Sequence, residues 1–351
     1  MPAKGSCCCD VIRAGTMWKI NVHTGETVVS LDYSHAFSPD PISGMCGFDG
    51  SQAVEIGSVT GAGNSRLWTL SGSLVWGPVS RDDRTERGWA HFLDDHIVYG
   101  SEETAGGILQ VLDRSNGDQV AHSMTGFFVK AEDDYIDTFE NSTGTLRRYE
   151  DDLSTLRTSV THGSASALPV SRSASYVTSS SGSLKSWDPS DLSPRLNLVP
   201  PFNRDGVGAD DEGGVYIWDQ GTDRIVKYTT STPDWDVIDA AFPNMTSSFG
   251  AFGNWYNILG SAILTKIDGV DGSIAWVCDF SAFTSGSIAA HLIRHLIIGH
   301  SGVILLPLAT HGLIAIDDHY GSVIWDSPNK GYGRPIPDGD DYVWCCGLYG
   351  T

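Results

Sequence analysis

The sequence is poor in positive charge and has no long apolar run. It contains 22 Lys and Arg residues against 43 Asp and Glu residues, which gives a formal net charge of −21 at pH 7. A protein that binds DNA or RNA must neutralise phosphates and needs the opposite balance, which excludes a nucleic-acid partner. The longest apolar stretch is interrupted by Pro307 and is far shorter than the roughly 20 residues that cross a bilayer. We therefore expect no nucleic-acid binding and no membrane insertion.

The sequence also lacks a secretory signal and a disulfide framework. Its first ten residues, MPAKGSCCCD, have no apolar core of the length that a signal peptide requires, so we expect synthesis in the cytoplasm without export by that route. The seven cysteines lie at positions 7, 8, 9, 46, 278, 345 and 346. An odd number crowded at the two ends is unlike the spread pairs of a disulfide-stabilised domain, so reduced cysteines are expected.

Glycine and aromatic residues are abundant. The chain has 40 glycines, 10% aromatic residues and 40% hydrophobic residues. This composition favours many short strands separated by tight turns, and it supplies enough apolar material for a core. An all-β chain is the expected fold class.

An internal repeat supports this expectation. Residues 265–276, 313–325 and 67–76 each read as a strand, a turn with Gly-Ser, and a second strand with a Trp four residues after the Gly. The Gly and Trp pairs are Gly72 with Trp76, Gly272 with Trp276, and Gly321 with Trp325. Three occurrences of one pattern indicate a repeated structural unit.

Weaker copies of the unit extend the repeat over the whole chain. The residues just before the turns, called anchors below, are Asn21, Thr69, Asp113, Glu150, Asp188, Thr229, Asp268 and Asp317. Their mean spacing is about 42 residues, which suits one four-stranded propeller blade per copy. We therefore predict a single closed β-propeller domain over residues 1–351, with about eight four-stranded blades and with seven as the alternative.

The two ends of the chain are expected to complete one blade. The last strand, residues 342–346, follows Asp340-Asp341 and has no turn-and-Trp partner after it, whereas the first copy, residues 17–29, lacks strands before it. Pairing these segments would leave no unpaired edge between the first and last blades. We also expect Cys7–Cys9 to lie close to this shared blade.

The strong copies resemble the quinoprotein-type propellers, also called PQQ-like repeats. The family pattern is a strand ending in Asp, a turn ending in Gly, and a Trp four residues later; Asp268, Gly272 and Trp276 match it, as do Asp317, Gly321 and Trp325. Gly72 and Trp76 match with Thr69 in the Asp position. The resemblance implies that these Trp residues dock between adjacent blades, with the indole N–H donating to the backbone.

The residues that suggest chemistry do not form a convincing catalytic or metal site. His291, His295 and His300 have no carboxylate or cysteine within their run, and Cys345-Cys346 lies in the predicted closing strand. Asp268 and Asp271 fit turn-forming residues that bond their own backbone. We predict no catalytic, cofactor-binding or metal-binding residues and no cofactor.

Three function classes follow. The first is a non-catalytic interaction or scaffold propeller that holds other proteins of an assembly, such as a tail, neck or host-attachment subunit of a bacteriophage virion. The second is a carbohydrate-binding propeller that uses exposed indoles; its candidates are Trp89, Trp187, Trp218, Trp235 and Trp255. The third is an enzyme, either quinone-dependent or a hydrolase at the channel mouth. The first is our prediction.

Overall fold

The structure is a computed structural model whose regular elements are almost entirely β-strands. It describes residues 5–6, 16–32, 43–49, 51–57, 63–69, 73–81, 89–100, 109–123, 127–132, 134–140, 142–162, 170–172, 175–180, 183–199, 206–210, 212–219, 221–238, 245–251, 253–259, 262–283, 297–298, 302–308, 311–328, 336–338 and 341–346. One short 3-10 helix, η1 (Ser281–Phe283), follows a strand. The predicted all-β class is confirmed.

The described strands form eight antiparallel sheets, numbered here by their order along the chain. Sheet 1 contains β1 (Gly5–Ser6), β4 (Ser43–Phe48), β5 (Gln52–Gly57), β6 (Gly63–Thr69) and β7 (Leu74–Arg81). Sheet 2 contains β8 (Trp89–Phe92), β9 (His96–Gly100), β10 (Leu109–Asp113) and β11 (Gln119–Ser123). Sheet 3 contains β12 (Phe127–Glu132), β13 (Tyr135–Glu140), β14 (Thr145–Glu150) and β15 (Leu156–Thr161). Sheet 4 contains β16 (Val170–Arg172), β17 (Ser175–Ser180), β18 (Ser183–Trp187) and β19 (Pro194–Leu198).

The remaining sheets repeat this layout. Sheet 5 contains β20 (Gly206–Ala209), β21 (Val215–Asp219), β22 (Arg224–Tyr228) and β23 (Pro233–Ile238). Sheet 6 contains β24 (Met245–Ala251), β25 (Asn254–Leu259), β26 (Ile263–Ile267) and β27 (Ile274–Asp279). Sheet 7 contains β28 (Ile297–Ile298), β29 (Val303–Leu308), β30 (Gly312–Asp317) and β31 (Val323–Pro328). Sheet 8 combines β32 (Ile336–Asp338), β33 (Tyr342–Cys346), β2 (Thr16–Asn21) and β3 (Thr27–Asp32), in that order.

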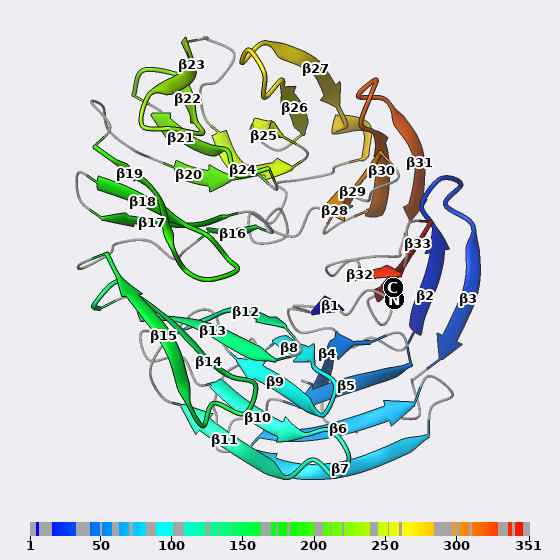
Figure 1. Ribbon diagram of the computed structural model, residues 1–351. Helices are drawn as coiled ribbons and strands as arrows, with labels where there is room; N and C mark the ends of the chain where they lie inside the picture. Colours follow the sequence, from blue (N-terminus) through cyan, green and yellow to red (C-terminus); the bar gives the residue numbers. More distant parts are fainter. Residues whose placement is uncertain are drawn as a thin grey trace.

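The sheets lie one after another around a common centre, each with its last strand at the periphery (Figure 1). The second and third strands are buried on both faces because neighbouring sheets cover them; every residue of β21 and of β29 is buried. The outer strands alternate between buried and exposed residues, as in β27, because one of their faces remains in solvent.

The predicted anchors occupy equivalent positions. Each of the eight lies at the turn between the third strand of its sheet and the outermost strand, as Asp268 does between β26 and β27. In each described outer hairpin the register shifts next to this turn, for example between Lys266 and Ile267. The repeat read from the sequence is therefore a hairpin at the periphery.

The two ends of the chain meet in sheet 8. Strand β2 pairs antiparallel with β33, with Trp18 opposite Cys345 and Lys19 opposite Trp344. The first residues depart from the expected layout: Gly5 and Ser6 pair with β4, which gives sheet 1 a fifth strand where four were predicted. Short Gly-Ser backbone can add to the inner edge of a sheet because it has almost no side chain to place. Cys7–Cys9 lie outside the described residues.

Deleting residues 340–351 should destabilise the protein and cause aggregation. The deletion removes β33, so β2 and β32 lose their shared partner and expose unpaired backbone edges. We expect a lower melting temperature by calorimetry and a larger aggregate fraction by light scattering. Deleting only residues 347–351 leaves β33 intact and should change neither. Equal behaviour of the two truncations would contradict a structural role for this pairing.

Candidate functional site

The turns that precede the outermost strands share one geometry. Asp113, Asp188, Asp268 and Asp317 each accept a hydrogen bond on Oδ1 from the backbone N–H two residues later, at 2.7–2.8 Å. Thr69 does the equivalent through Oγ1, which accepts from the N–H of Ser73 at 3.0 Å. These side-chain caps explain why Asp favours the anchor position. After Asp113, Asp188, Asp268 and Asp317, the carbonyl of the next residue points toward the preceding sheet.

In four interfaces the carbonyl directly after the anchor accepts a hydrogen bond from an indole N–H of the preceding sheet. The bonds run from Trp76 to Arg114, from Trp235 to Gly269, from Trp276 to Asp318, and from Trp325 to Val22, with Nε1···O distances of 2.7–2.9 Å. In every case the acceptor is the residue directly after an anchor. One donor type and one acceptor position thus connect sheets 1 and 2, 5 and 6, 6 and 7, and 7 and 8.

Glycine is required where the indole lies on the turn. Gly321 has φ +68°, and a Cβ placed there would lie 2.6 Å from the ring of Trp276. Gly117, Gly272 and Gly25 stand in the same relation to Trp76, Trp235 and Trp325, with closest approaches of 2.6–2.7 Å. Both the left-handed backbone and the lack of space exclude a side chain.

The sequence-predicted residues are distributed over these contacts. Trp76 and Trp276 are buried, and Trp325 is partly buried. Gly72 lies outside the described residues. In sheets 6 and 7 the turn glycine lies against the Trp of the preceding sheet, as Gly272 does against Trp235 and Gly321 against Trp276. Trp235 was missed because Thr-Pro-Asp stands before it in place of the Gly-Ser signal.

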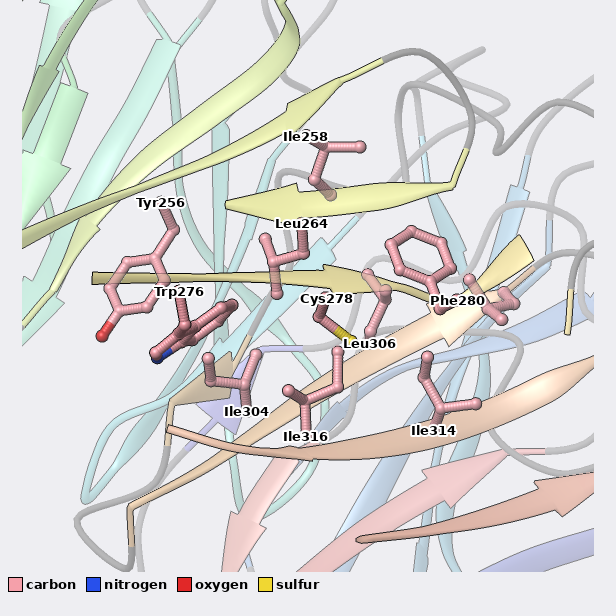
Figure 2. Close-up of a cluster of buried hydrophobic side chains, with 11 residues drawn as sticks. Tyr256, Ile258, Leu264, Trp276, Cys278, Phe280, Ile304, Leu306, Ile314 and Ile316 are labelled. Carbon is pink, nitrogen blue, oxygen red and sulfur yellow. The ribbon is translucent and has the colours of Figure 1, made fainter. Parts of the chain in front are cut away.

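Apolar packing surrounds each docked indole. Between sheets 6 and 7, Trp276 lies beside Tyr256, Ile304 and Ile316, and Cys278 points into the same layer (Figure 2). Burial raises the pKa of the Cys278 thiol, with a smaller contribution from the negative charge of Asp279. Cys278 is therefore an inert packing residue in this layer.

Four sheets have another residue in place of the docked Trp, and other side chains fill the space between the sheets. The position that Trp occupies elsewhere holds Val29, Ala121, Thr158 or Leu196. Ala121 and Thr158 lie in sheets 2 and 3. The outer turns of the sheets that follow them, sheets 3 and 4, carry Leu153 and Leu192, both with φ near +60°. Leu192 is 1% exposed and packs with Phe139 and Leu146 of sheet 3. A leucine on the turn thus fills the space that an indole fills from the other side.

Cationic side chains reach the same carbonyls. Arg148 donates to the carbonyls of Pro189 and Ser190 in the next sheet while it pairs with Asp137 through Nε at 2.8 Å and Nη2 at 2.7 Å. Lys227 donates to Gly269 O at 2.9 Å, and Lys266 donates to Asp318 O at 3.1 Å. Arg148 and Lys227 are buried and Lys266 is partly buried; each has a carboxylate partner, Asp137, Asp210 and Asp318 respectively, which offsets the cost of desolvating the charge.

Buried tyrosines complete the pattern. Tyr176 Oη donates to Asp137, and Tyr256 Oη donates to Asp318, at 2.7 and 2.6 Å. Burial raises the pKa of Tyr176, and the neighbouring carboxylate of Asp137 raises it further. A neutral tyrosine that only donates to a carboxylate suits a structural role between sheets.

The remaining acidic residues gather at one end of the sheets. In a four-stranded meander the first and third turns lie at the same end, and backbone bonds such as Arg114 N to Asp95 O and Asp318 N to Gly302 O join them. We call this end the turn face. Its described acidic residues are Asp49, Asp94, Asp95, Asp134, Asp210, Glu212 and Asp341 from first turns, and Glu26, Asp113, Asp118, Glu150, Asp151, Asp152, Asp188, Asp191, Asp268, Asp271, Asp317 and Asp318 from third turns.

Positive charge from the adjoining strands balances part of the turn face: Arg157 pairs with Asp134 and Glu150, Arg195 with Asp188, Lys227 with Asp210, and Lys266 with Asp318. The chain segments of these turns contain one Lys or Arg, Arg114, which pairs with Asp49 and donates to Gln52 and Leu93. Hydrogen bonds from serines lower the pKa of Asp113 and of Asp271. These carboxylates stay charged well below neutral pH, which makes the face a strong negative surface.

The other candidates from the sequence do not assemble into a site. His291, His295 and His300 lie outside the described residues, and across the described ranges no three His, Cys, Asp or Glu side chains are grouped to hold a metal ion. Trp187, Trp218, Trp235 and Trp255 are buried, so none of them is a glycan platform, and the side chain of Trp89 is outside the described part. No helix among the described residues is long and apolar enough to span a membrane.

Replacing Trp276 by Ala should lower the free energy of unfolding by ~3–5 kcal/mol, as expected for a large core truncation. Replacing Gly321 by Ala should cost more than replacing Gly302 by Ala. Gly302 has φ +71° but nothing within 4 Å, so it reports the backbone cost alone, about 1–2 kcal/mol. In the Trp276→Ala background the two glycine penalties should become equal, as measured by chemical denaturation. A Gly321 penalty that does not change would contradict direct docking.

Acid should weaken the turn of sheet 4. Hydrogen bonds from Ser190, followed by Arg195, lower the pKa of Asp188 to about 2 from 3.8. Because the folded-state pKa is depressed, this stabilisation is present above about pH 4 and is lost as the pH falls toward 2. Asp188→Asn should therefore melt at a lower temperature than the unmodified protein at pH 6, and the difference should shrink at pH 2. A difference that is the same at both pH values would refute this.

Comparisons with known proteins identify the fold. No family model matches the sequence, and no curated protein matches it. Solved structures resemble it, among them three that each cover most of this chain. They are the computationally designed Ika8 protein (TM-score 0.56, 12% identity, covering 86% of this chain and 94% of that one), BamB from Moraxella catarrhalis (0.51, 11%, 94% and 91%) and the C-terminal WD40 domain of Sif2 (0.52, 8%, 98% and 99%). At these identities the likeness concerns the fold alone, and BamB and the WD40 domain make that fold a β-propeller.

Proposed function

We propose that residues 1–351 form one closed, eight-bladed propeller that acts as a non-catalytic interaction module. The eight sheets would be its blades, and sheet 8, which contains both ends of the chain, would close the ring. A disc held by docked indoles and buried ion pairs is a rigid support for partner binding. The surface that supports this function best is the acidic turn face.

The charge of the turn face indicates the kind of partner. Each of the eight sheets contributes at least one described acidic turn residue to this face. Many of these residues are exposed, such as Asp118, Asp191 and Asp271. A surface of one sign attracts a partner of the opposite sign and accelerates its association. We therefore infer a basic protein segment as the partner.

Two exposed apolar residues at the tips of neighbouring turns add contact area. Val270 of sheet 6 is 87% exposed, and Tyr320 of sheet 7 is 72% exposed. Large apolar side chains held out by rigid turns lose little entropy on binding, and tyrosine is enriched among residues that dominate binding energy. A basic segment with an apolar or aromatic residue fits this combination.

A subunit of a larger assembly is the form of the module that we propose, with a tail, neck or host-attachment component of a bacteriophage virion as the concrete case. The lack of the positive charge that nucleic-acid binding requires and the degenerate repeats support it. Native mass spectrometry and negative-stain microscopy of the purified protein test it. Rings or stacked oligomers agree with an assembly subunit, whereas a strictly monomeric particle that binds no protein contradicts it.

Neutralising the turn face should weaken binding of a basic peptide. We propose measuring binding of a synthetic peptide of alternating Lys and Leu residues by fluorescence anisotropy at 50 and 150 mM salt. Asp191→Asn/Asp271→Asn should reduce affinity several-fold, because Asn keeps the turn bonds to Ser193 and Ser273 but removes the charge. Tyr320→Ser should weaken binding with little effect on its salt dependence.

A matched variant controls for net charge. Asp223 and Asp279 lie at the opposite end of sheets 5 and 6, so Asp223→Asn/Asp279→Asn changes the total charge equally. This variant should bind the peptide as the unmodified protein does. If both double variants weaken binding to the same extent, the interaction reflects overall acidity and the turn face has no special role.

A further inference from the structure

Buried polar atoms without a hydrogen-bond partner concentrate between sheets 5 and 6. In the described part of the chain they include Nε1 of Trp218, Nε1 of Trp255, Oγ1 of Thr265, and both Nδ2 and Oδ1 of Asn257. These four residues are at least nine-tenths buried. Unpaired buried groups are rare in folded proteins because each costs free energy, so a cluster of them needs a physical cause.

The strand register brings three of these side chains to one level of the interface. Asn257 and Thr265 are directly opposite each other on β25 and β26. They face sheet 5, since Trp255, two residues before Asn257, stacks on Tyr216 of β21 with ring centroids 4.7 Å apart. Strands β21 and β25 are both second strands and run in the same direction, so Trp218, two residues after Tyr216, lies at the level of Asn257.

Asn257 and Thr265 do not bond each other, although they are directly opposite on neighbouring strands. Directly opposed side chains on antiparallel strands have Cβ atoms about 4.5–5.5 Å apart, within reach of each other. An amide and a hydroxyl at that separation still form no direct bond here. Polar groups held this way suit a bridging molecule of the size of water.

The donors and acceptors match water in number. Trp218 Nε1 and Asn257 Nδ2 only donate, and Asn257 Oδ1 accepts, while the hydroxyl of Thr265 can do either. A water molecule accepts two hydrogen bonds and donates two, which this set can supply. We propose that the interface between sheets 5 and 6 contains an internal water-binding site formed by Trp218, Asn257 and Thr265.

The surroundings favour water over an ion. The three side chains are neutral, and the nearest cation of this layer, Lys227 Nζ, already donates to the carbonyls of Gly253 and Gly269 at 3.2 and 2.9 Å. An anion would lack a compensating charge, and a metal ion would lack carboxylate or imidazole ligands. The proposed occupant is therefore one or more ordered water molecules.

Ser186 provides a matched comparison in another interface. Its hydroxyl is also buried without a partner, but its surroundings between sheets 4 and 5 are the apolar side chains of Val177, Leu184 and Leu196. A lone hydroxyl in such a setting gains nothing from water, because a bound water needs several polar partners. Removing this hydroxyl should stabilise the protein.

The test combines melting temperatures with a crystal structure of the unmodified protein at a resolution that shows ordered solvent. Thr265→Val keeps the volume of the side chain and removes one partner of the water, so we expect a lower melting temperature. Ser186→Ala should raise it or leave it unchanged. Density for a water within hydrogen-bond distance of Trp218, Asn257 and Thr265 is expected in the crystal.

Two results would overturn the proposal. A higher melting temperature for Thr265→Val would mean that its hydroxyl is a dry, uncompensated group. Crystal density without a molecule between the three side chains, or density that fits an ion rather than water, would do so independently of whether the variant folds. Thr265→Ser keeps the hydroxyl and should show the same water in its own crystal structure.

Discussion

The architecture depends on one recurring contact, in which the backbone carbonyl directly after the anchor of an outer turn accepts a hydrogen bond from the preceding sheet. The described residues show it for the outer turns of sheets 2, 4, 6, 7 and 8. Trp76, Trp235, Trp276 and Trp325 supply the indole N–H for this bond, and Arg148 supplies guanidinium N–H groups. The carbonyl is free to accept because the anchor side chain caps the turn and directs the chain outward. Sheet 6, for example, presents the acceptor Gly269 O to the sheet before it and the donor Trp276 Nε1 to the sheet after it.

Different side chains fill the space between the sheets in different interfaces. Where an indole lies on the turn, the turn residue is a glycine with positive φ; where the indole is absent, Leu153 or Leu192 adopts a similar backbone and fills the gap itself. A non-glycine residue in this conformation costs about 1–2 kcal/mol, which burial of a leucine side chain offsets. This exchange explains how the repeat diverges in sequence while the interfaces remain packed.

Several ion pairs lie between the sheets and are not available for partner binding at the surface. Asp137, Arg148 and Lys227 are used between sheets, and Lys266 pairs with Asp318. In the outer turns Glu150 and Asp188 pair with Arg157 and Arg195, and the acidic residues of the turn face still outnumber the cations that pair with them. The same turns that hold the sheets together therefore carry the negative face proposed for partner binding.

The sequence by itself determined the all-β class, the period of the repeat and the positions of the eight outer turns, because Asp, Gly and Trp at fixed spacing report local backbone geometry. It also pointed to Trp76 and Trp276 as packing residues. Tertiary structure alone decided that the Gly and Trp of one repeat serve different neighbours, that Trp235 belongs with the docked indoles, and that Leu192 replaces one of them. These contacts join residues of different repeats, 34 to 42 positions apart for Trp76, Trp235 and Trp276 and 303 for Trp325. They depend on how one sheet lies against the next, which no pattern within a single repeat encodes.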